Sequence, residues 1–162
     1  MKRAKGFTSV NIRKPTSSDL SDIKLILEDT DLFPPEMLED MIEPFFRGNE
    51  QQDRWLVCET ENEAVIGFSY TRAEHLAESV WNLLAIGFRS QHQGSGFGTK
   101  LIEEVERSIS GERILIVETS SLDDFDKTRD FYRNCGYDQE AVIRDYWADG
   151  DDKVIFRKRL SP

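Results

Sequence analysis

Histidine and cysteine are scarce in this chain, whose 162 residues include two of each. Cys58 and Cys135 lie far apart and outside the spacings typical of metal ligands, and His75 and His92 alone cannot complete a zinc site. We therefore expect no bound metal and two reduced thiols, as in proteins of reducing compartments.

Long hydrophobic runs are also lacking. No segment approaches the roughly 20 apolar residues that a membrane-spanning helix needs, so we expect no membrane association. The start of the chain, residues 1–6, is basic, but no apolar signal-peptide core follows it. The sequence therefore predicts a cytoplasmic protein.

Basic residues are the third shortage. Lys and Arg number 21 against 31 Asp and Glu, which gives a formal net charge of −10. Nucleic acid is not an expected partner, because contacts to phosphates require basic surface. The acidic balance is compatible with a cationic amine as substrate. With 38% hydrophobic residues, the chain is long enough for a single folded domain, which we expect to span residues 1–162.

Hydrophobic periodicity and turn residues predict an α/β fold. The run 113–119 is almost continuously apolar, as in a strand buried on both faces. Only one strand-helix-strand unit occurs in mid-chain, so we expect a mixed, largely antiparallel central sheet flanked by helices. The expected order is strand (10–14), helices (20–30 and 35–47), strands (54–60, 64–72 and 80–88), helix (99–110), strand (113–119), helix (124–135) and strands (140–147 and 153–160).

Glycine is concentrated after the strand 80–88, where Gly94, Gly96 and Gly98 alternate before a helical pattern. Glycine reaches positive φ and lets the backbone approach a ligand, and the free N–H groups of a helix's first turn attract anions. The segment therefore predicts a phosphate-binding loop. It lacks the third glycine of the dinucleotide fingerprint, since Thr99 occupies that position, and it contains no Walker-type Gly-Lys-Ser or Gly-Lys-Thr.

This loop resembles the acyl-CoA loop of the GNAT superfamily of N-acetyltransferases, whose pattern is Q/R-x-x-G-x-G/A. Gln93, Gly96 and Gly98 occupy its fixed positions. The element order also matches the family, so the resemblance implies the acyl-CoA N-acyltransferase (GNAT) fold over most of the chain. It further implies acetyl-CoA as co-substrate and transfer of an acetyl group to a primary amine by direct attack in a ternary complex.

In the family, the amide arm of the cofactor pairs with the backbone of the strand before the loop, and its diphosphate lies on the loop. The implied cofactor contacts are Ile86, Gly87, Phe88, Gln93, Gly94, Ser95, Gly96, Phe97, Gly98 and Thr99.

Two residues are candidates for proton transfer. Tyr132 matches the family motif Y-x-x-x-G-F/Y, in which the tyrosine donates a proton to the departing CoA sulfur. Glu118 ends an apolar strand and resembles the proton acceptor of the branch that acetylates ribosomal-protein amino termini. Alternatively, Glu118 is an ion-pair partner and ordered water relays the proton. Asn82 occupies a second family position for the base and cannot serve, and Phe125 replaces an asparagine that contacts the cofactor in many relatives.

The acceptor amine is not specified by the sequence. Phe33, Tyr70, Trp81 and Tyr146 are aromatic candidates for its binding site, although each also fits a core position. The slight similarity to the ribosomal-protein branch favours a peptide amino terminus over a lysine or a small-molecule amine. A homodimer is compatible with the family resemblance.

Two other functions remain open. A non-catalytic acyl-CoA-binding or sensor module would need the loop but not the base. A dinucleotide-binding domain gains support from Glu118, an acidic residue about 20 positions beyond the loop. The predicted strand order argues against the second alternative.

Overall fold

The computed structural model describes residues 9–62 and 64–162. The basic start at residues 1–6, and Glu63 in the predicted turn between two strands, lie outside the described residues. The strands are β1 (Val10–Arg13), β2 (Asp53–Thr60), β3 (Val65–Ala73), β4 (Val80–Phe88), β5 (Ile114–Ser120), β6 (Asp138–Ala148) and β7 (Asp151–Arg159). The α-helices are α1 (Leu20–Thr30), α2 (Leu38–Phe46), α3 (Phe97–Ser108) and α4 (Asp126–Asn134), each preceded by a short 3₁₀ turn.

The predicted order of elements and the mixed, largely antiparallel sheet are confirmed. The seven strands lie in the order β1-β2-β3-β4-β5-β7-β6. Within the described ranges, β4 and β5 form the one parallel pair. α3 crosses over between them, as a parallel connection requires.

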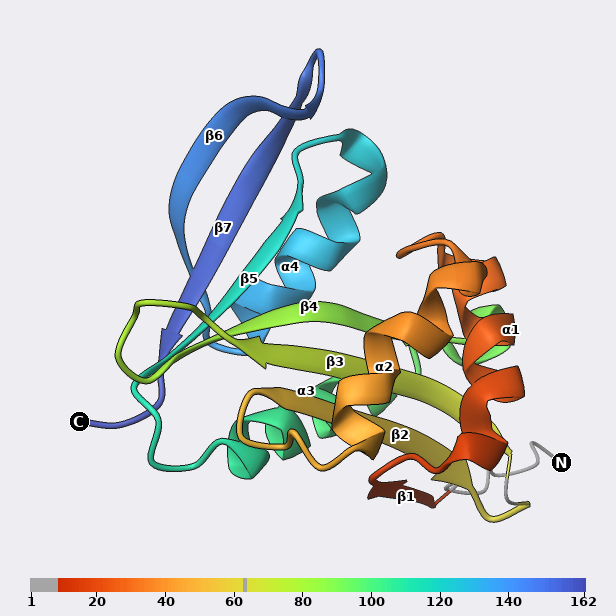
Figure 1. Cartoon of the computed structure of the whole chain (residues 1–162). Coiled ribbons are helices and arrows are strands. Elements are labelled where there is room, and N and C mark those ends of the chain that lie inside the picture. Colours follow the sequence, from red (N-terminus) through yellow and green to blue (C-terminus); the bar gives the residue numbers. More distant parts are fainter. Residues whose placement is uncertain (1–8, 63) are drawn as a thin grey trace, which may run out of the picture.

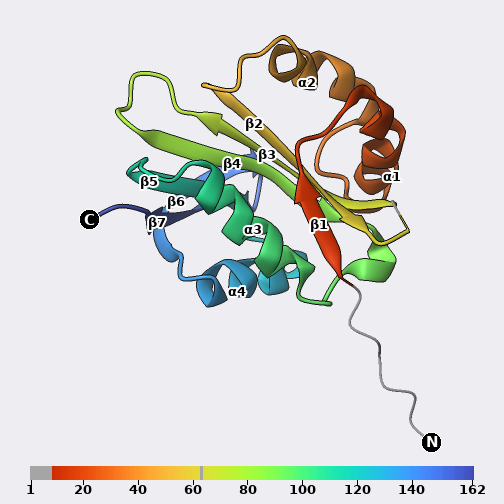
Figure 2. The same ribbon diagram turned by 90° about the horizontal axis from the view of Figure 1, so that it is seen from below.

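Helices cover both faces of the sheet, but unequally (Figures 1 and 2). α1 and α2 lie over β2, β3 and β4 on one face, whereas α3 and α4 lie on the other face. On the first face, β5, β7 and β6 extend beyond the helices (Figure 1). None of the helices within the described part of the chain is long and apolar enough to span a membrane.

The prediction that the run 113–119 is buried on both faces is wrong. Along β5, Leu115 and Val117 are buried, whereas Ile114, Ile116 and Glu118 are half-buried. The half-buried side chains point to the same face of the sheet as α1 and α2, in the part that these two helices do not cover (Figure 1). Apolar sequence alone does not tell whether a helix covers both sides of a strand.

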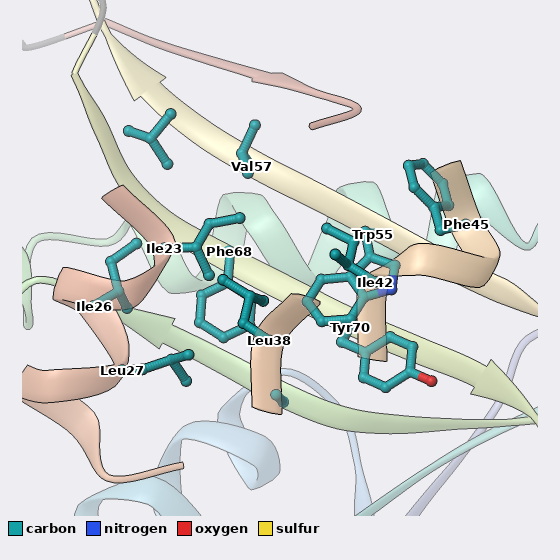
Figure 3. Close-up of a cluster of buried hydrophobic side chains, with 12 residues drawn as sticks. Ile23, Ile26, Leu27, Leu38, Ile42, Phe45, Trp55, Val57, Phe68 and Tyr70 are labelled. Carbon is teal, nitrogen blue, oxygen red and sulfur yellow. The ribbon is translucent and has the colours of Figure 1, made fainter. Parts of the chain in front are cut away.

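Two hydrophobic cores hold the helices on the sheet. Ile23, Ile26 and Leu27 recur at helical spacing on α1 and pack against fully buried Trp55 and Phe68 (Figure 3). Burying each such side chain contributes about 1.5 to 3 kcal/mol to stability. The core on the opposite face comprises Trp81, Leu83, Ile102, Val105, Ile109, Leu115, Val117, Tyr132, Tyr137, Val154 and Phe156.

Candidate functional site

The site begins where two neighbouring strands separate. β4 and β5 pair only from Val80 opposite Ile114 to Leu83 opposite Val117. Beyond this point β4 continues along β3 and β5 continues along β7, and the two strands diverge in Figure 1. We call this divergence the β4–β5 split. The edge of β4 that faces the split therefore carries backbone N–H and C=O groups that β5 does not pair.

A β-bulge lies at the start of the split. Tyr70 on β3 pairs with Ala85 and Thr71 pairs with Leu83, so Leu84 is the extra residue on β4. A bulge bends a strand and increases its twist. The bulge thus redirects the last residues of β4, which include the predicted cofactor contacts Ile86, Gly87 and Phe88, away from β5.

The loop after β4 is tied to its surroundings at its base. The Arg89 N–H donates to the carbonyl of Ile66 on β3 at 2.8 Å. Asp29 on α1 accepts hydrogen bonds from the Ser90 N–H at 3.0 Å and from Arg89 Nε at 2.7 Å. These two bonds, the one from Ser90 first, lower the pKa of Asp29 below its ordinary value. The base of the loop is therefore fixed by both β3 and α1.

Phe88 and Phe97 join the two ends of the loop. Their rings stack with centroids 6.4 Å apart in a buried cluster beneath α3. Gly67 on β3 provides the space, because a Cβ there would lie 2.3 Å from Phe88 Cε1. Gln93, a predicted cofactor contact, donates from Nε2 to the Phe88 carbonyl at 3.1 Å. Its side chain therefore closes the loop onto the end of β4.

The tip of the loop presents amide groups without partners. Gly94 and Gly96 have φ of +74° and +83°, which favours glycine. A Cβ at either position would meet nothing within 4 Å, so conformation rather than space requires glycine there. α3 then begins at Phe97 without a side-chain N-cap. Within the described ranges, the N–H groups of residues 94–98 have no hydrogen-bond partner outside α3. They form a cradle of amides at the positive end of the helix dipole, an arrangement that suits an anion.

Tyr132 on α4 is 4% exposed. Its ring packs against Tyr137 and Phe156, with centroids 6.0 and 5.6 Å away, and Ile86 from the free end of β4 contacts the same core. Burial, and to a smaller extent Cys135, raises the pKa of Tyr132 above its ordinary value. The phenol is therefore protonated at neutral pH, and no described residue accepts a hydrogen bond from it.

Glu118 is the first residue of β5 beyond the paired stretch. Its Oε2 lies 2.9 Å from Nζ of Lys153 on β7, in an ion pair whose side chains are 21% and 10% exposed. Asn82 Nδ2 donates to Glu118 Oε1 at 3.4 Å and to Glu74 Oε1 at 2.9 Å. The predicted base is thus held by a cation on β7 and by an amide on β4.

Tyr132 and Glu118 approach the split from opposite faces of the sheet. Leu115 and Val117 point into the core that contains Tyr132. Because side chains alternate across a strand, Glu118 points to the other face, which α1 and α2 leave uncovered beyond β4 (Figure 2). A protonated phenol and a carboxylate therefore lie on the two faces of the sheet beside the split.

The four aromatic acceptor candidates do not form one surface. Phe33 and Tyr70 belong to the core beneath α1 and α2, where Tyr70 stacks on Trp55 at 4.2 Å (Figure 3). Trp81 belongs to the core on the opposite face. Tyr146 is 50% exposed on β6. Of the four, Tyr146 alone lies at the surface of the uncovered part of the sheet.

Phe125, at the family's asparagine position, ends the 3₁₀ turn before α4 and is 39% exposed. Nearby, Ser120 Oγ donates to Asp151 and accepts from the Leu122 N–H at 3.1 Å. This serine therefore forms part of the turn that leads into α4.

Sequence reasoning did not identify Lys153 or Asp29. Lys153 meets Glu118 only through the pairing of β7 with β5, and Asp29 meets the loop only because α1 packs beside the end of β4. Neither residue belongs to a local motif. Lys153 stands between Asp152 and buried Val154 at the start of β7, where its charge resembles that of an ordinary solvated turn.

Solved structures with this architecture are numerous. One is a protein from Desulfovibrio desulfuricans that is assigned to the GNAT family, with 26% identity, a TM-score of 0.86 and alignment over 94% of this chain and 100% of that one. Another is the ribosomal-protein-S18-alanine N-acetyltransferase of Escherichia coli, at 18% identity and TM-score 0.74, over 95% and 96% of the two chains. A third is a variant of the spermidine N-acetyltransferase of Vibrio cholerae, at 16% identity and TM-score 0.77, over 94% of each chain.

A comparison with curated proteins finds no match. The model of the acetyltransferase (GNAT) domain matches residues 51–139, a range that contains the split, the loop, Glu118 and Tyr132. Because this range exceeds half of the sequence, the chain belongs to the GNAT family of acetyltransferases, which transfer an acetyl group to an amine.

Proposed function

We propose that this protein is an acetyl-CoA-dependent N-acetyltransferase that acts on a primary amine through a ternary complex. The observation that carries the proposal is the row of unpartnered N–H groups at residues 94–98, which directly follows the free edge of β4. Solved neighbours named for ribosomal-protein alanine and for spermidine support an amine as the acceptor class. The acceptor is a peptide amino terminus, a lysine or a small-molecule amine.

Two sets of backbone groups suit coenzyme A: those of the loop after Phe88 and those at the end of β4. The amides of Gly94, Ser95, Gly96, Phe97, Gly98 and Thr99 would hold the diphosphate. The β4 edge at Ile86, Gly87 and Phe88 would pair with the amides of the pantetheine arm, since those edge groups have no partner in β5. The bound cofactor would supply an activated acetyl thioester at the β4–β5 split.

Tyr132 is the proposed proton donor. Its buried phenol keeps its proton at neutral pH, and its ring belongs to the core that Ile86 of β4 and Val117 of β5 also contact. A proton delivered from this oxygen stabilises a departing thiolate. The absence of a hydrogen bond from the phenol to any described residue supports this assignment.

Glu118 is the proposed proton acceptor, directly or through one water molecule. Its carboxylate already holds an ammonium group, that of Lys153, at 2.9 Å. An acceptor amine that takes this place would lie where a proton can pass to the carboxylate. The amine would then be neutral and able to attack.

Thermal unfolding with and without acetyl-CoA tests the cofactor site. We expect acetyl-CoA to raise the Tm, because a ligand that binds only the folded state stabilises it. NAD at the same concentration should leave the Tm unchanged. If the Kd is micromolar, acetyl-CoA at about 100 μM should stabilise the protein measurably. An unchanged Tm at that concentration would overturn the proposal.

A panel of amines with release of the CoA thiol as readout tests the reaction. Thiol release that depends on one class of amine supports the enzyme. Acetyl-CoA binding without thiol release for any amine would favour a non-catalytic acyl-CoA-binding module.

A further inference from the structure

Lys153 occupies a site built for an alkylammonium group. Its Nζ lies 2.9 Å from Glu118 Oε2, 4.2 Å from the ring centroid of Tyr146 and 5.9 Å from that of Trp147. A carboxylate and two aromatic faces are the groups that attract an organic cation in a partly desolvated site. The lysine side chain is 10% exposed, so these neighbours enclose it.

This ammonium site lies at the β4–β5 split. Val117 is the last residue of β5 that pairs with β4, and Glu118 comes next. Lys153 pairs with Ser120, which is also beyond the last paired residue. The amine of Lys153 is therefore next to the carboxylate that we assign as proton acceptor, where an external acceptor amine would bind.

We propose that Lys153 is a modification site, at which the enzyme acetylates itself within one chain. The proposal rests on the proposed function, because the acetyl group comes from acetyl-CoA bound at the cradle. Lys153 would then accept the acetyl group in place of an external amine. Any external amine would have to displace it from Glu118.

The reaction balances with acetyl-CoA, Lys153, Glu118 and Tyr132 as its participants. The ammonium of Lys153 loses one proton to Glu118, and this proton passes on to solvent. A bond forms between Nζ and the acetyl carbon while the bond between that carbon and the CoA sulfur breaks. The sulfur takes the proton of Tyr132, and the second proton lost from Nζ restores the phenol. The products are Nε-acetyllysine, the CoA thiol and one proton.

Lys158 provides a matched control on the same strand. Its Nζ also pairs with a carboxylate, Glu106 Oε1 at 2.6 Å, and also lies near an aromatic ring, that of Tyr137 at 5.3 Å. However, Lys158 points to the α3 and α4 face and pairs with Leu115, within the stretch where β4 and β5 are joined. Comparison of the two lysines therefore separates proximity to the split from ion pairing, and Lys158, at 29% exposed against 10% for Lys153, is the more accessible of the two.

The test is site-resolved mass spectrometry after incubation of the purified protein with acetyl-CoA. We expect the initial rate of acetylation at Lys153 to exceed that at Lys158 by at least about tenfold, since a positioned intramolecular amine reacts faster. The rate at Lys153 should not change when the protein is diluted tenfold. In heat-unfolded protein the two lysines should react equally.

Two variants sharpen the test. Lys153→Arg keeps a cation beside Glu118 and should fold with an unchanged Tm, but intact mass should show one acetyl group fewer. Lys158→Arg should still accept that group. Equal rates at the two lysines in folded protein, or a Lys153 rate proportional to protein concentration, would overturn the proposal.

The outcomes separate the inference from the proposed function. A Tm shift with acetyl-CoA and thiol release with an external amine, together with unmodified Lys153, would overturn self-acetylation and leave the enzyme in place. No Tm shift with acetyl-CoA would overturn both.

Discussion

The two halves of the candidate site use different parts of the polypeptide. The half that follows β4 consists of backbone: unpartnered amides at residues 94–98 and a strand edge, with glycine at the two positions of positive φ. The half at the end of β5 consists of side chains, chiefly Glu118, Lys153 and Asn82, on the part of the sheet that extends beyond α1 and α2 (Figure 1). One half therefore depends on conformation, and the other depends on charge.

This difference indicates how the two ligands would be recognised. A diphosphate offers the same oxygens to any row of amides, so a backbone site suits a cofactor shared by a whole family. An acceptor amine is distinguished by side chains, which can change without altering the fold. Substitutions in the backbone half after β4 should therefore change the affinity for the cofactor, and substitutions in the side-chain half at the end of β5 should change turnover. Tyr132, which belongs to neither half, should affect turnover through the leaving thiolate.

Tyr132→Phe should have the largest effect. Loss of the phenol proton is expected to lower kcat about 1000-fold, within the range for general acid catalysis. The Kd for acetyl-CoA should change by less than about twofold, because the ring remains and the hydroxyl bonds no described residue. Thiol-release kinetics and titration calorimetry measure the two quantities. An unchanged kcat would remove Tyr132 from the mechanism.

The pH dependence of kcat provides an independent check on this residue. Burial raises the pKa of Tyr132 above its ordinary value of 10.0. The phenol should therefore keep its proton, and kcat should not fall through its ionisation, up to pH 10. A wild-type kcat that falls below pH 10, with no such fall in Tyr132→Phe, would mean that Tyr132 ionises there. That result would contradict its raised pKa.

Glu118→Gln should have the next largest effect, with kcat lowered about 100-fold because the amide cannot accept the amine's proton. Glu74→Gln is the matched control: Glu74 bonds the same Asn82 Nδ2, and its variant should keep kcat within about threefold of the wild type. Glu118→Gln also leaves the buried ammonium group of Lys153 without its carboxylate, which destabilises the protein. The double variant with Lys153→Met removes that unpaired charge and so separates the loss of the base from the loss of stability. The double variant should regain stability without regaining turnover. Full turnover in Glu118→Gln would exclude this glutamate as the base.

Gly96→Ala tests the backbone half. A Cβ at φ +83° costs about 1 to 2 kcal/mol, and a loop that moves to relieve it should bind acetyl-CoA about tenfold more weakly. Gly150→Ala is the control, since its φ of +81° and open surroundings match those of Gly96 but lie in the turn between β6 and β7. Both variants should lose similar stability in thermal unfolding. Equal Kd values for the two variants would show that the cradle does not hold the cofactor.

Asp29→Ala should have the smallest effect. It removes the acceptor for the Ser90 N–H and for Arg89 Nε, and should weaken acetyl-CoA binding about threefold without changing kcat. Glu43→Ala, which breaks a surface ion pair with Arg47 away from the loop, should leave the Kd unchanged. A tenfold loss in Asp29→Ala would mean that side chains contribute to the cradle as much as the backbone does.

The features that could be predicted from the sequence are those that a short local pattern determines. The strand, glycines and helix start around Gly96 are contiguous, so their order alone indicated the loop, and Tyr132 stands in a short motif. An ion pair of Glu118 was one of the two alternatives that the sequence left open, and the structure contains one. Its partner could not be predicted, because Lys153 joins Glu118 through the register of two strands distant in the sequence. Similarly, the aromatic candidates Tyr70 and Trp81 point to opposite cores, on two sides of a strand pair that carries a bulge at Leu84.

The stack of Phe88 on Phe97 means that the cradle is shaped before any ligand arrives. Both ends of the loop are fastened to the interior, and the space for the stack comes from Gly67 on a different strand. Preorganisation of this kind removes the entropic penalty of ordering a flexible loop on association. Affinity for a diphosphate would then be governed partly by a glycine that is buried against Phe88 on a neighbouring strand.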